Sequence, residues 1–227
     1  MTRLGDLTWP EAAARSGQVL VVPIGSTEQH GPHLPLSTDT DIARALAVGL
    51  AARRADVVVA PDLPYGASGE HAGFPGTLSI GHEALELVLV ELVRSAAESF
   101  PHVLLVNGHG GNVPTLAKAV ARLRAESRDV LAWSPPWRGD AHAGRTETSV
   151  QLALDPARVG DVRAAGATAG LAELMPALRR GGLRAVTDNG VLGDPEGASA
   201  EEGQALLLEA LDHLEATVVA WLQTDMA

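Results

Sequence analysis

The sequence contains no cysteine. This absence excludes disulfide bonds, thiolate metal ligands and a cysteine nucleophile, so any bound metal must be held by His, Asp or Glu. Aromatic residues are also scarce, at 3% of the chain, although hydrophobic residues make up 46%. A buried core must therefore consist mostly of Leu, Val and Ala.

Basic residues are outnumbered, with 17 Lys and Arg against 28 Asp and Glu, for a formal net charge of −11. This balance argues against a nucleic acid partner, which requires clustered Lys and Arg around the phosphates. No apolar run reaches the ~18 residues of a membrane-spanning helix, and no basic amphipathic face suits a membrane surface. Residues 1–17 contain no run of signal-peptide length. We expect a cytoplasmic protein without a membrane partner.

The hydrophobic pattern alternates between strands and helices. Four apolar, β-branched runs are typical of buried parallel strands, at residues 19–24, 56–60, 102–106 and 130–133. Helical periodicity follows at residues 41–54, 81–100 and 113–126 and from about residue 145 to the end, with one Gly-rich interruption at 181–197 and a final helix capped by Ser199. The alternation predicts a single α/β domain over residues 1–227, with a mostly parallel central sheet in a three-layer αβα arrangement.

Polar residues gather directly after three of these strands. The first group runs from Gly25 to His33, with Asp39 shortly after it. The second is Asn107-Gly-His109-Gly-Gly-Asn112, and the third begins at His142. Ligands of open parallel sheets bind beyond the carboxyl ends of the strands. We therefore expect the three groups to share one edge of the sheet.

Four of these side chains suit a metal site. Glu28 and His30 are two residues apart, so on extended backbone they project to the same side. With Asp39 and His109 they offer the carboxylate and imidazole ligands that zinc, iron(II) or manganese accept. Each has a simpler explanation when taken alone: a surface charge for Glu28, a turn residue for His30 and a helix N-cap for Asp39. Their joint placement at neighbouring strand ends favours the metal site.

The glycines around His109 allow a second interpretation, a phosphate-binding loop. However, neither a Walker motif nor G-x-G-x-x-G is present, and a histidine inside the turn suits a metal better. The glycines are expected to let the backbone pass close to the metal and the substrate. Residues 62–79 form a long loop of the kind that is often functional. The residues expected to line a substrate pocket are Glu70, His71, Trp137, Gly110, Gly111 and Asn112.

The motifs resemble those of the creatininase (creatinine amidohydrolase) family. The similar segments are residues 25–35, 38–40, 107–112 and 142–149. Residues 65–71 (YGASGEH), 142–149 (HAGRTETS) and 190–195 (GVLGDP) are similar to the mycofactocin-system branch of that family. The resemblance implies a creatininase-like fold and a metal-dependent amidohydrolase. It also implies that the substrate is a modified precursor peptide, which loses its C-terminal Val-Tyr dipeptide.

The resemblance also implies roles for individual residues. Glu28 and His109 would hold one metal ion and His30 another, with Asp39 bridging both, so that one or two ions of zinc, iron(II) or manganese bind per subunit. His142 would be the acid–base residue. A homo-oligomer is implied, and the peptide could be delivered by other proteins of the mycofactocin pathway.

One position departs from the family pattern. Creatininase has a glutamate ligand two residues after the histidine that matches His109, and this chain has Gly111 there. We expect Glu147, five residues after His142, to replace that ligand. The alternative role for Glu147 is a negative charge at a helix N-terminus.

Alternative functions remain open at this point. Another hydrolase of the same family, acting on creatinine or on a formamide, would share the metal centre and differ in its pocket walls. A non-catalytic metal- or anion-binding module belongs to a different class of protein.

Overall fold

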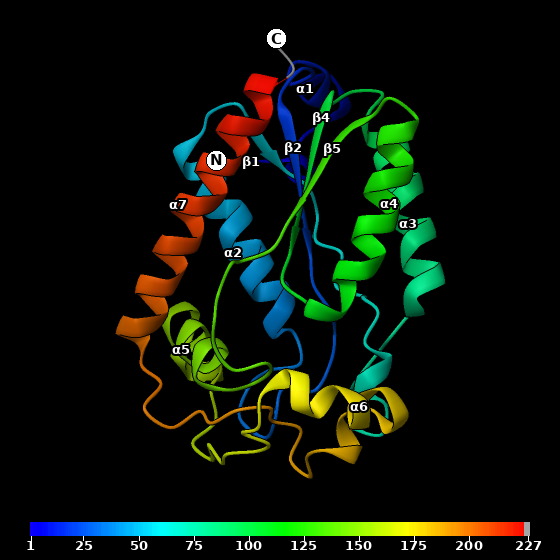
Figure 1. Ribbon diagram of the computed structural model, residues 1–227. Coiled ribbons are helices and arrows are strands. Elements are labelled where there is room, and N and C mark those ends of the chain that lie inside the picture. Colours follow the sequence, from blue (N-terminus) through cyan, green and yellow to red (C-terminus); the bar gives the residue numbers. More distant parts are fainter. Residues whose placement is uncertain (225–227) are drawn as a thin grey trace.

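A parallel β-sheet of five strands runs through the centre of the protein (Figure 1), in the order β1-β3-β2-β4-β5. The computed structural model describes residues 1–224. The central pair, β2 and β4, is in register from Val19 opposite His102 to Ile24 opposite Asn107. The strands are Thr2–Arg3 (β1), Val19–Ile24 (β2), Val57–Val59 (β3), His102–Asn107 (β4) and Asp129–Trp133 (β5).

Helices connect the strands and cover the sheet. The α-helices are Trp9–Ala13 (α1), Thr38–Arg53 (α2), Gly81–Ala96 (α3), Val113–Ala125 (α4), Arg145–Leu154 (α5), Leu171–Gly181 (α6) and Ala200–Thr224 (α7). Short 3₁₀ helices lie at Leu4–Asp6 (η1), Gly69–His71 (η2), Gly110–Asn112 (η3), Pro156–Arg158 (η4) and Leu183–Ala185 (η5). None of the helices over residues 1–224 combines the length and the apolar composition needed to cross a membrane.

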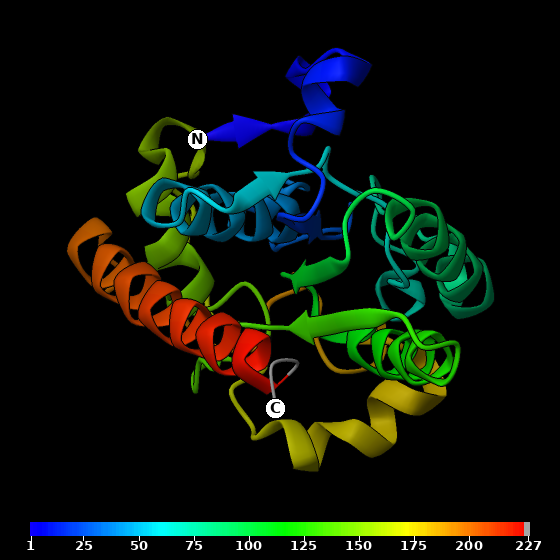
Figure 2. The same ribbon diagram turned by 90° about the horizontal axis from the view of Figure 1, so that it is seen from above.

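The alternation of side chains along each strand produces two separate cores. In β2, Val19 and Val21 pack with apolar residues of α2, α5 and α7 on one face of the sheet. Leu20 and Val22 pack with residues of α3 and α4 on the other face. Figure 2 shows α2 and α7 on one side of the sheet and the two green helices α3 and α4 on the other. The predicted three-layer α/β architecture is confirmed.

All four predicted strands are present, and the helices over 41–54, 81–100 and 113–126 are present with shifted ends. The cap of the last helix is also confirmed, because the Ser199 hydroxyl accepts a hydrogen bond from the Glu202 backbone N–H at 3.1 Å. The helix predicted through residues 155–170 is wrong. That stretch holds only the short turn η4, since Pro156, Gly160, Gly166 and Gly170 interrupt any helix.

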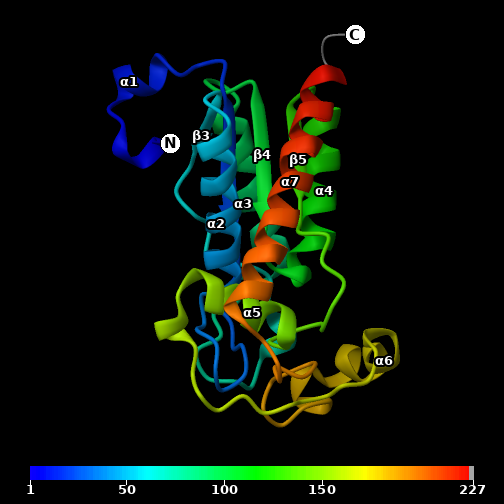
Figure 3. The ribbon, with the colours of Figure 1, turned by 90° about the vertical axis from the view of Figure 1, so that its left-hand side faces the viewer.

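The loops after β2, β4 and β5 meet at one end of the sheet. Figure 3 shows α5 and α6 at this end, whereas both ends of the chain lie toward the opposite end of the molecule. Helix α6 covers the carboxyl ends of the strands without burying any residue of its own. This end of the sheet therefore combines the polar loops with a surface helix above them.

Candidate metal centre and active site

Two glycines allow the first turn of α2 to approach the ends of the central strands. A Cβ on Gly25 would lie 2.3 Å from Thr40 Oγ1, and a Cβ on Gly108 would lie 2.1 Å from the backbone oxygen of Asp39. Only glycine fits such contacts without displacing the backbone. Asp39 is therefore held in the first turn of α2 beside the loops after β2 and β4. It is not the N-cap of that helix, which is Ser37.

Three buried side chains from these elements form a first group. His109 Nδ1 lies 3.3 Å from Glu28 Oε2 and 3.2 Å from Asp39 Oδ2. One potential ligand atom from each residue lies within 4.8 Å of the other two. The side chains are almost fully shielded from solvent, at 0% exposure for Glu28, 1% for Asp39 and 5% for His109.

A second group shares Asp39 with the first. His30 Nε2 lies 3.0 Å from Asp39 Oδ1 and 3.9 Å from Glu147 Oε2. These three residues also place potential ligand atoms within 4.8 Å of one another. Asp39 thus directs one carboxylate oxygen toward each group, as a residue between two metal ions would. The structure brings together all five residues expected as metal ligands.

The residues present fit a divalent cation. Among residues 1–224, both carboxylate oxygens of Glu28 and Oδ2 of Asp39 are buried and accept no well-oriented hydrogen bond, although imidazole nitrogens lie 3.1–3.3 Å away. Burying a carboxylate without such a hydrogen bond is strongly unfavourable unless a positively charged group compensates its charge. A donor set of imidazole nitrogens and carboxylate oxygens matches zinc, manganese or iron. The cluster is therefore able to bind metal.

The electrostatics of the cluster also favour positive charge. Burial lowers the pKa of His30, but the Asp39 and Glu147 carboxylates outweigh this effect and raise the pKa to about 10. Burial also lowers the pKa of His109, but the Glu28 and Asp39 carboxylates outweigh it and raise this pKa well above its usual value. Burial is also the main cause that raises the pKa of Glu147, to about 7. A metal ion would supply the positive charge that these groups otherwise obtain from protons.

His142 lies against the second group. Its ring centroid is 4.3 Å from that of His30 and 4.5 Å from that of His71. Its Nε2 donates a hydrogen bond to the backbone oxygen of Gln29 at 2.8 Å, and Nδ1 lies 3.8 Å from Glu28 Oε1. Burial, aided by His30, lowers the pKa of His142 well below its usual value. Glu28, His30 and His142 also meet the spacing of a metal-binding group.

Gln29, which was not among the predicted site residues, positions these histidines. Its side-chain Nε2 lies 3.1 Å from His71 Nδ1 and donates to the backbone oxygen of Gly190 at 3.0 Å. His71 Nε2 in turn lies 3.1 Å from Glu28 Oε1. Its place between two potential ligands, Glu28 and His30, is the only sequence signal that could have identified Gln29.

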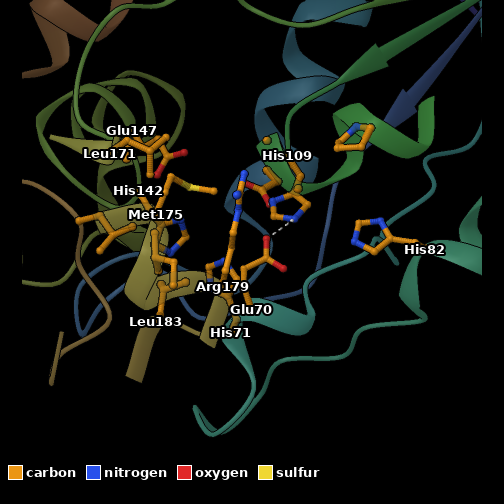
Figure 4. A pocket seen from close by; sticks show the side chains of 17 residues that line it. Glu70, His71, His82, His109, His142, Glu147, Leu171, Met175, Arg179 and Leu183 are labelled. Carbon is orange, nitrogen blue, oxygen red and sulfur yellow. Dashed lines mark ion pairs between the residues drawn. The ribbon is translucent and has the colours of Figure 1, made fainter. Parts of the chain in front are cut away.

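Part of the cluster forms the floor of a cavity of about 460 Å³ (Figure 4). The cluster residues that line it are Asp39, His109, His142 and Glu147. Of the predicted pocket residues, Glu70, His71, Gly110 and Gly111 line it. One wall comes from α6 and the segment after it, which the sequence did not indicate as part of the site. The cavity-lining residues of this wall are Leu171, Met175, Leu178, Arg179 and Leu183.

Two predicted pocket residues lie elsewhere. Trp137 packs on the core beside α7, and its indole N–H donates to the backbone oxygen of Leu206 at 3.2 Å. Asn112 is fully buried, and its side chain links two loops. Its side-chain oxygen accepts a hydrogen bond from the Ala67 N–H at 2.9 Å, and its side-chain N–H donates to the backbone oxygen of Gly25. His82, to which we assigned no role, does line the cavity.

Residues 5–218 match the family model of creatininase, described as creatinine amidohydrolase. The chain belongs to the creatininase family. The mycofactocin precursor peptide peptidase of Mycolicibacterium smegmatis is 54% identical over 213 residues, which cover 89% of this chain and 85% of that protein. The peptidase of the same name from Mycobacterium tuberculosis is 48% identical over 231 residues, covering 96% and 91%.

Solved creatininase structures share the fold. A structure described as creatininase Mn has a TM-score of 0.80 at 28% identity, and the similarity covers 96% of this chain and 97% of that one. A mutant creatininase of Zn-Zn type also has a TM-score of 0.80 at 28% identity, covering 95% and 96%. Together with the peptidase-named relatives, the family identifies this protein as a hydrolase that acts on amide bonds. The non-catalytic alternative is thereby excluded.

Proposed function

We propose that this hydrolase is a divalent-metal-dependent peptidase that releases the C-terminal Val-Tyr dipeptide from a modified mycofactocin precursor peptide. The observation that carries the metal dependence is the pair of largely buried groups that share Asp39, at the floor of the cavity. The names of relatives at 54% and 48% identity support the peptide substrate. The metal would be zinc, manganese or iron(II).

In this proposal the two groups have separate ions. Glu28, Asp39 and His109 would hold one ion, and His30, Asp39 and Glu147 would hold the second. Bound divalent ions lower the pKa of water and polarise the carbonyl of the scissile bond. Glu147 thus replaces the glutamate that the family pattern has at the position of Gly111.

The protein residues supply the proton transfers. His142 is neutral near pH 7 because its pKa is lowered, and its Nε2 proton is engaged by the Gln29 backbone oxygen. Its Nδ1 is therefore the atom that accepts a proton as water attacks. The same imidazole then passes the proton to the departing peptide nitrogen.

The apolar wall holds the fragment that leaves. Side chains of α6 and η5 face the floor across the cavity, where they shield the reacting amide from bulk water and contact the Val and Tyr side chains. As a further part of the proposal, the protein forms a homo-oligomer and receives the peptide from other proteins of the mycofactocin pathway.

The test is turnover by purified protein that is stripped of metal and reloaded with zinc, manganese or iron(II) in turn. The modified precursor peptide, creatinine and a formylaminopyrimidine are offered separately, with mass-spectrometric detection of products. We expect Val-Tyr release only from the peptide and only with metal. The Asp39→Ala variant should lose both bound ions and turnover. Hydrolysis of creatinine or of the formamide without peptide cleavage would assign the protein to a different activity of the family.

A further inference from the structure

One arginine on the cavity wall has no hydrogen-bond or ion-pair partner among residues 1–224. Among the described residues that line the cavity, Arg179 is the only Lys or Arg, and it lies in the last turn of α6. Its side chain makes no ion pair or hydrogen bond with any other residue in the described range 1–224. Arg184, shortly after it, is by contrast engaged: its guanidinium donates to the Gly73 backbone oxygen and lies 3.8 Å above the ring of Phe74.

The Arg179 side chain is placed to meet an anionic group of a ligand in the cavity. Figure 4 shows its side chain extending into the cavity toward the side where His109 lies, next to Met175 of the same helix. The floor and the adjacent loop carry carboxylates, among them Asp39 and Glu70. In the metal-loaded protein the bound ions would neutralise Asp39, whereas Glu70 belongs to none of the metal-binding groups. An anionic group of a ligand would be repelled by the Glu70 carboxylate and attracted by the guanidinium. The cavity therefore offers a hydrolytic floor, an apolar wall and one cationic side chain.

We propose that Arg179 binds the C-terminal α-carboxylate of the substrate and so fixes the cleavage point at a short distance from the chain end. This inference rests on the proposed peptidase function. A guanidinium can hold a carboxylate through two parallel N–H···O hydrogen bonds, which give both strength and orientation. The enzyme then recognises the end of the peptide and does not depend on its sequence alone.

The dimensions of the cavity agree with a short fragment. An extended chain advances about 3.3–3.6 Å per residue, so the two residues after the scissile bond span about 7 Å at most. The cavity volume of about 460 Å³ is toward the lower end of the range of about 300–1,000 Å³ found for ligand pockets. A cation inside the same small cavity as the metal-binding groups therefore suits the release of a short piece, such as a dipeptide.

A neighbouring residue provides the matched control. Arg180 follows Arg179 on α6, and it is likewise exposed, but it lines a second hollow and not the main cavity. Arginine and glutamine have similar helix propensities. Arg179→Gln and Arg180→Gln therefore remove the same charge from the same helix turn, and only the first removes it from the cavity.

The experiment offers two substrates to each metal-loaded enzyme form: the modified precursor peptide with a free C-terminal carboxylate and the same peptide with a C-terminal amide. We expect the native enzyme to cleave the acid with a kcat/KM about 10- to 100-fold above that for the amide, the size of one hydrogen-bonded charge pair. In Arg179→Gln the ratio should fall to about 1, because only the acid substrate loses an interaction. Arg180→Gln should keep the native ratio.

Three results would overturn the proposal: equal cleavage of acid and amide by the native enzyme, discrimination retained in Arg179→Gln, or equal slowing of both substrates by that variant. The last would show a structural role only. If neither peptide is cleaved, the proposed peptidase function has failed, and calorimetric binding of the Val-Tyr dipeptide and its amide decides the inference. A preference for the dipeptide acid that Arg179→Gln abolishes supports the carboxylate site, and equal binding of the two refutes it.

Discussion

Replacing Glu147 by glutamine should remove one of two bound ions and leave the metal-free protein unaffected. Glu147 supplies the third side chain of the group that contains His30 and Asp39, whereas the group of Glu28, Asp39 and His109 does not involve it. Glutamine keeps the shape of the side chain and can still accept the hydrogen bond that Glu147 receives from the Ala143 N–H at 2.6 Å. The substitution therefore removes only the negative charge of one potential metal ligand.

The size of the effect follows from linkage between binding and folding. Outer partners of metal ligands already change affinity by about 10–100-fold when mutated, so we take 100-fold for a direct ligand. At a free metal concentration of 100 times the native Kd, the second ion stabilises the protein by about 2.7 kcal/mol, and after a 100-fold loss by about 0.4 kcal/mol. The difference of about 2.3 kcal/mol lowers Tm by about 5–9 °C in a chain of this size.

The metal-free protein behaves differently because the pKa of Glu147 is raised to about 7. A carboxyl with a raised pKa stabilises the fold below its unfolded pKa of about 4.5, and this contribution is lost as pH rises through 7. Glutamine resembles the protonated form at every pH. Metal-free Glu147→Gln should therefore be at least as stable as the native protein at pH 7.

Elemental analysis and thermal unfolding, each with and without metal, measure these quantities. Glu70→Gln is the matched control, since Glu70 lines the same cavity and its Oε1 would lie 2.5 Å from a Cβ on Gly111, the position that departs from the family pattern. Glu70→Gln should keep both ions. Loss of an ion in that variant, with full occupancy in Glu147→Gln, would show that Glu70 and not Glu147 replaces the missing family ligand.

Three further predictions concern other residues. His142→Ala should keep its metal, as measured by elemental analysis, and lose turnover by about 10²–10⁴-fold; near-native kcat would remove His142 from the mechanism. Burial lowers the pKa of His33 to about 4, so the fold loses stability as pH falls from about 6.5 toward 4. Between pH 7 and 5, denaturant titrations should show that the free energy of unfolding falls by about 1–2 kcal/mol less in His33→Gln than in the native protein. An equal fall in both proteins would contradict this. Gly108→Ala should reduce the free energy of unfolding by at least about 1–3 kcal/mol because its Cβ meets the Asp39 backbone. The control, Gly110→Ala, should retain native stability, since its Cβ meets no described atom within 4 Å. Equal stability of the two variants would refute the close contact.

The strands and the floor of the site could be predicted because their signals are local. Residues 19–24 and 102–106 are β-branched or leucine-rich without a break, and the polar residues begin where these runs end. Parallel strands bring their carboxyl ends together, so Glu28 and His109 had to approach each other once the strands were recognised. The place of Asp39 could also be predicted, because it lies only nine residues after His30, where the same loop leads into a helix.

The wall of the cavity could not be predicted in the same way. Met175 and Arg179 are more than 60 residues after His109, and no strand end lies near them in the sequence. The glycines of residues 181–197, after α6, indicated a loop, but they carry no information about which part of the molecule that loop crosses. Trp137 was predicted for the pocket, and the apolar surface beside α7 instead accommodates its ring.

The lack of any buried residue in α6 has a consequence for how such enzymes diverge. Substitutions on an exposed helix rarely change stability by more than about 0.5 kcal/mol, whereas the floor residues are surrounded by the core and tolerate little change. Selection can therefore exchange the side chains above the reaction centre one at a time without endangering the chemistry below. New substrates for an old hydrolytic centre would arise on this helix first.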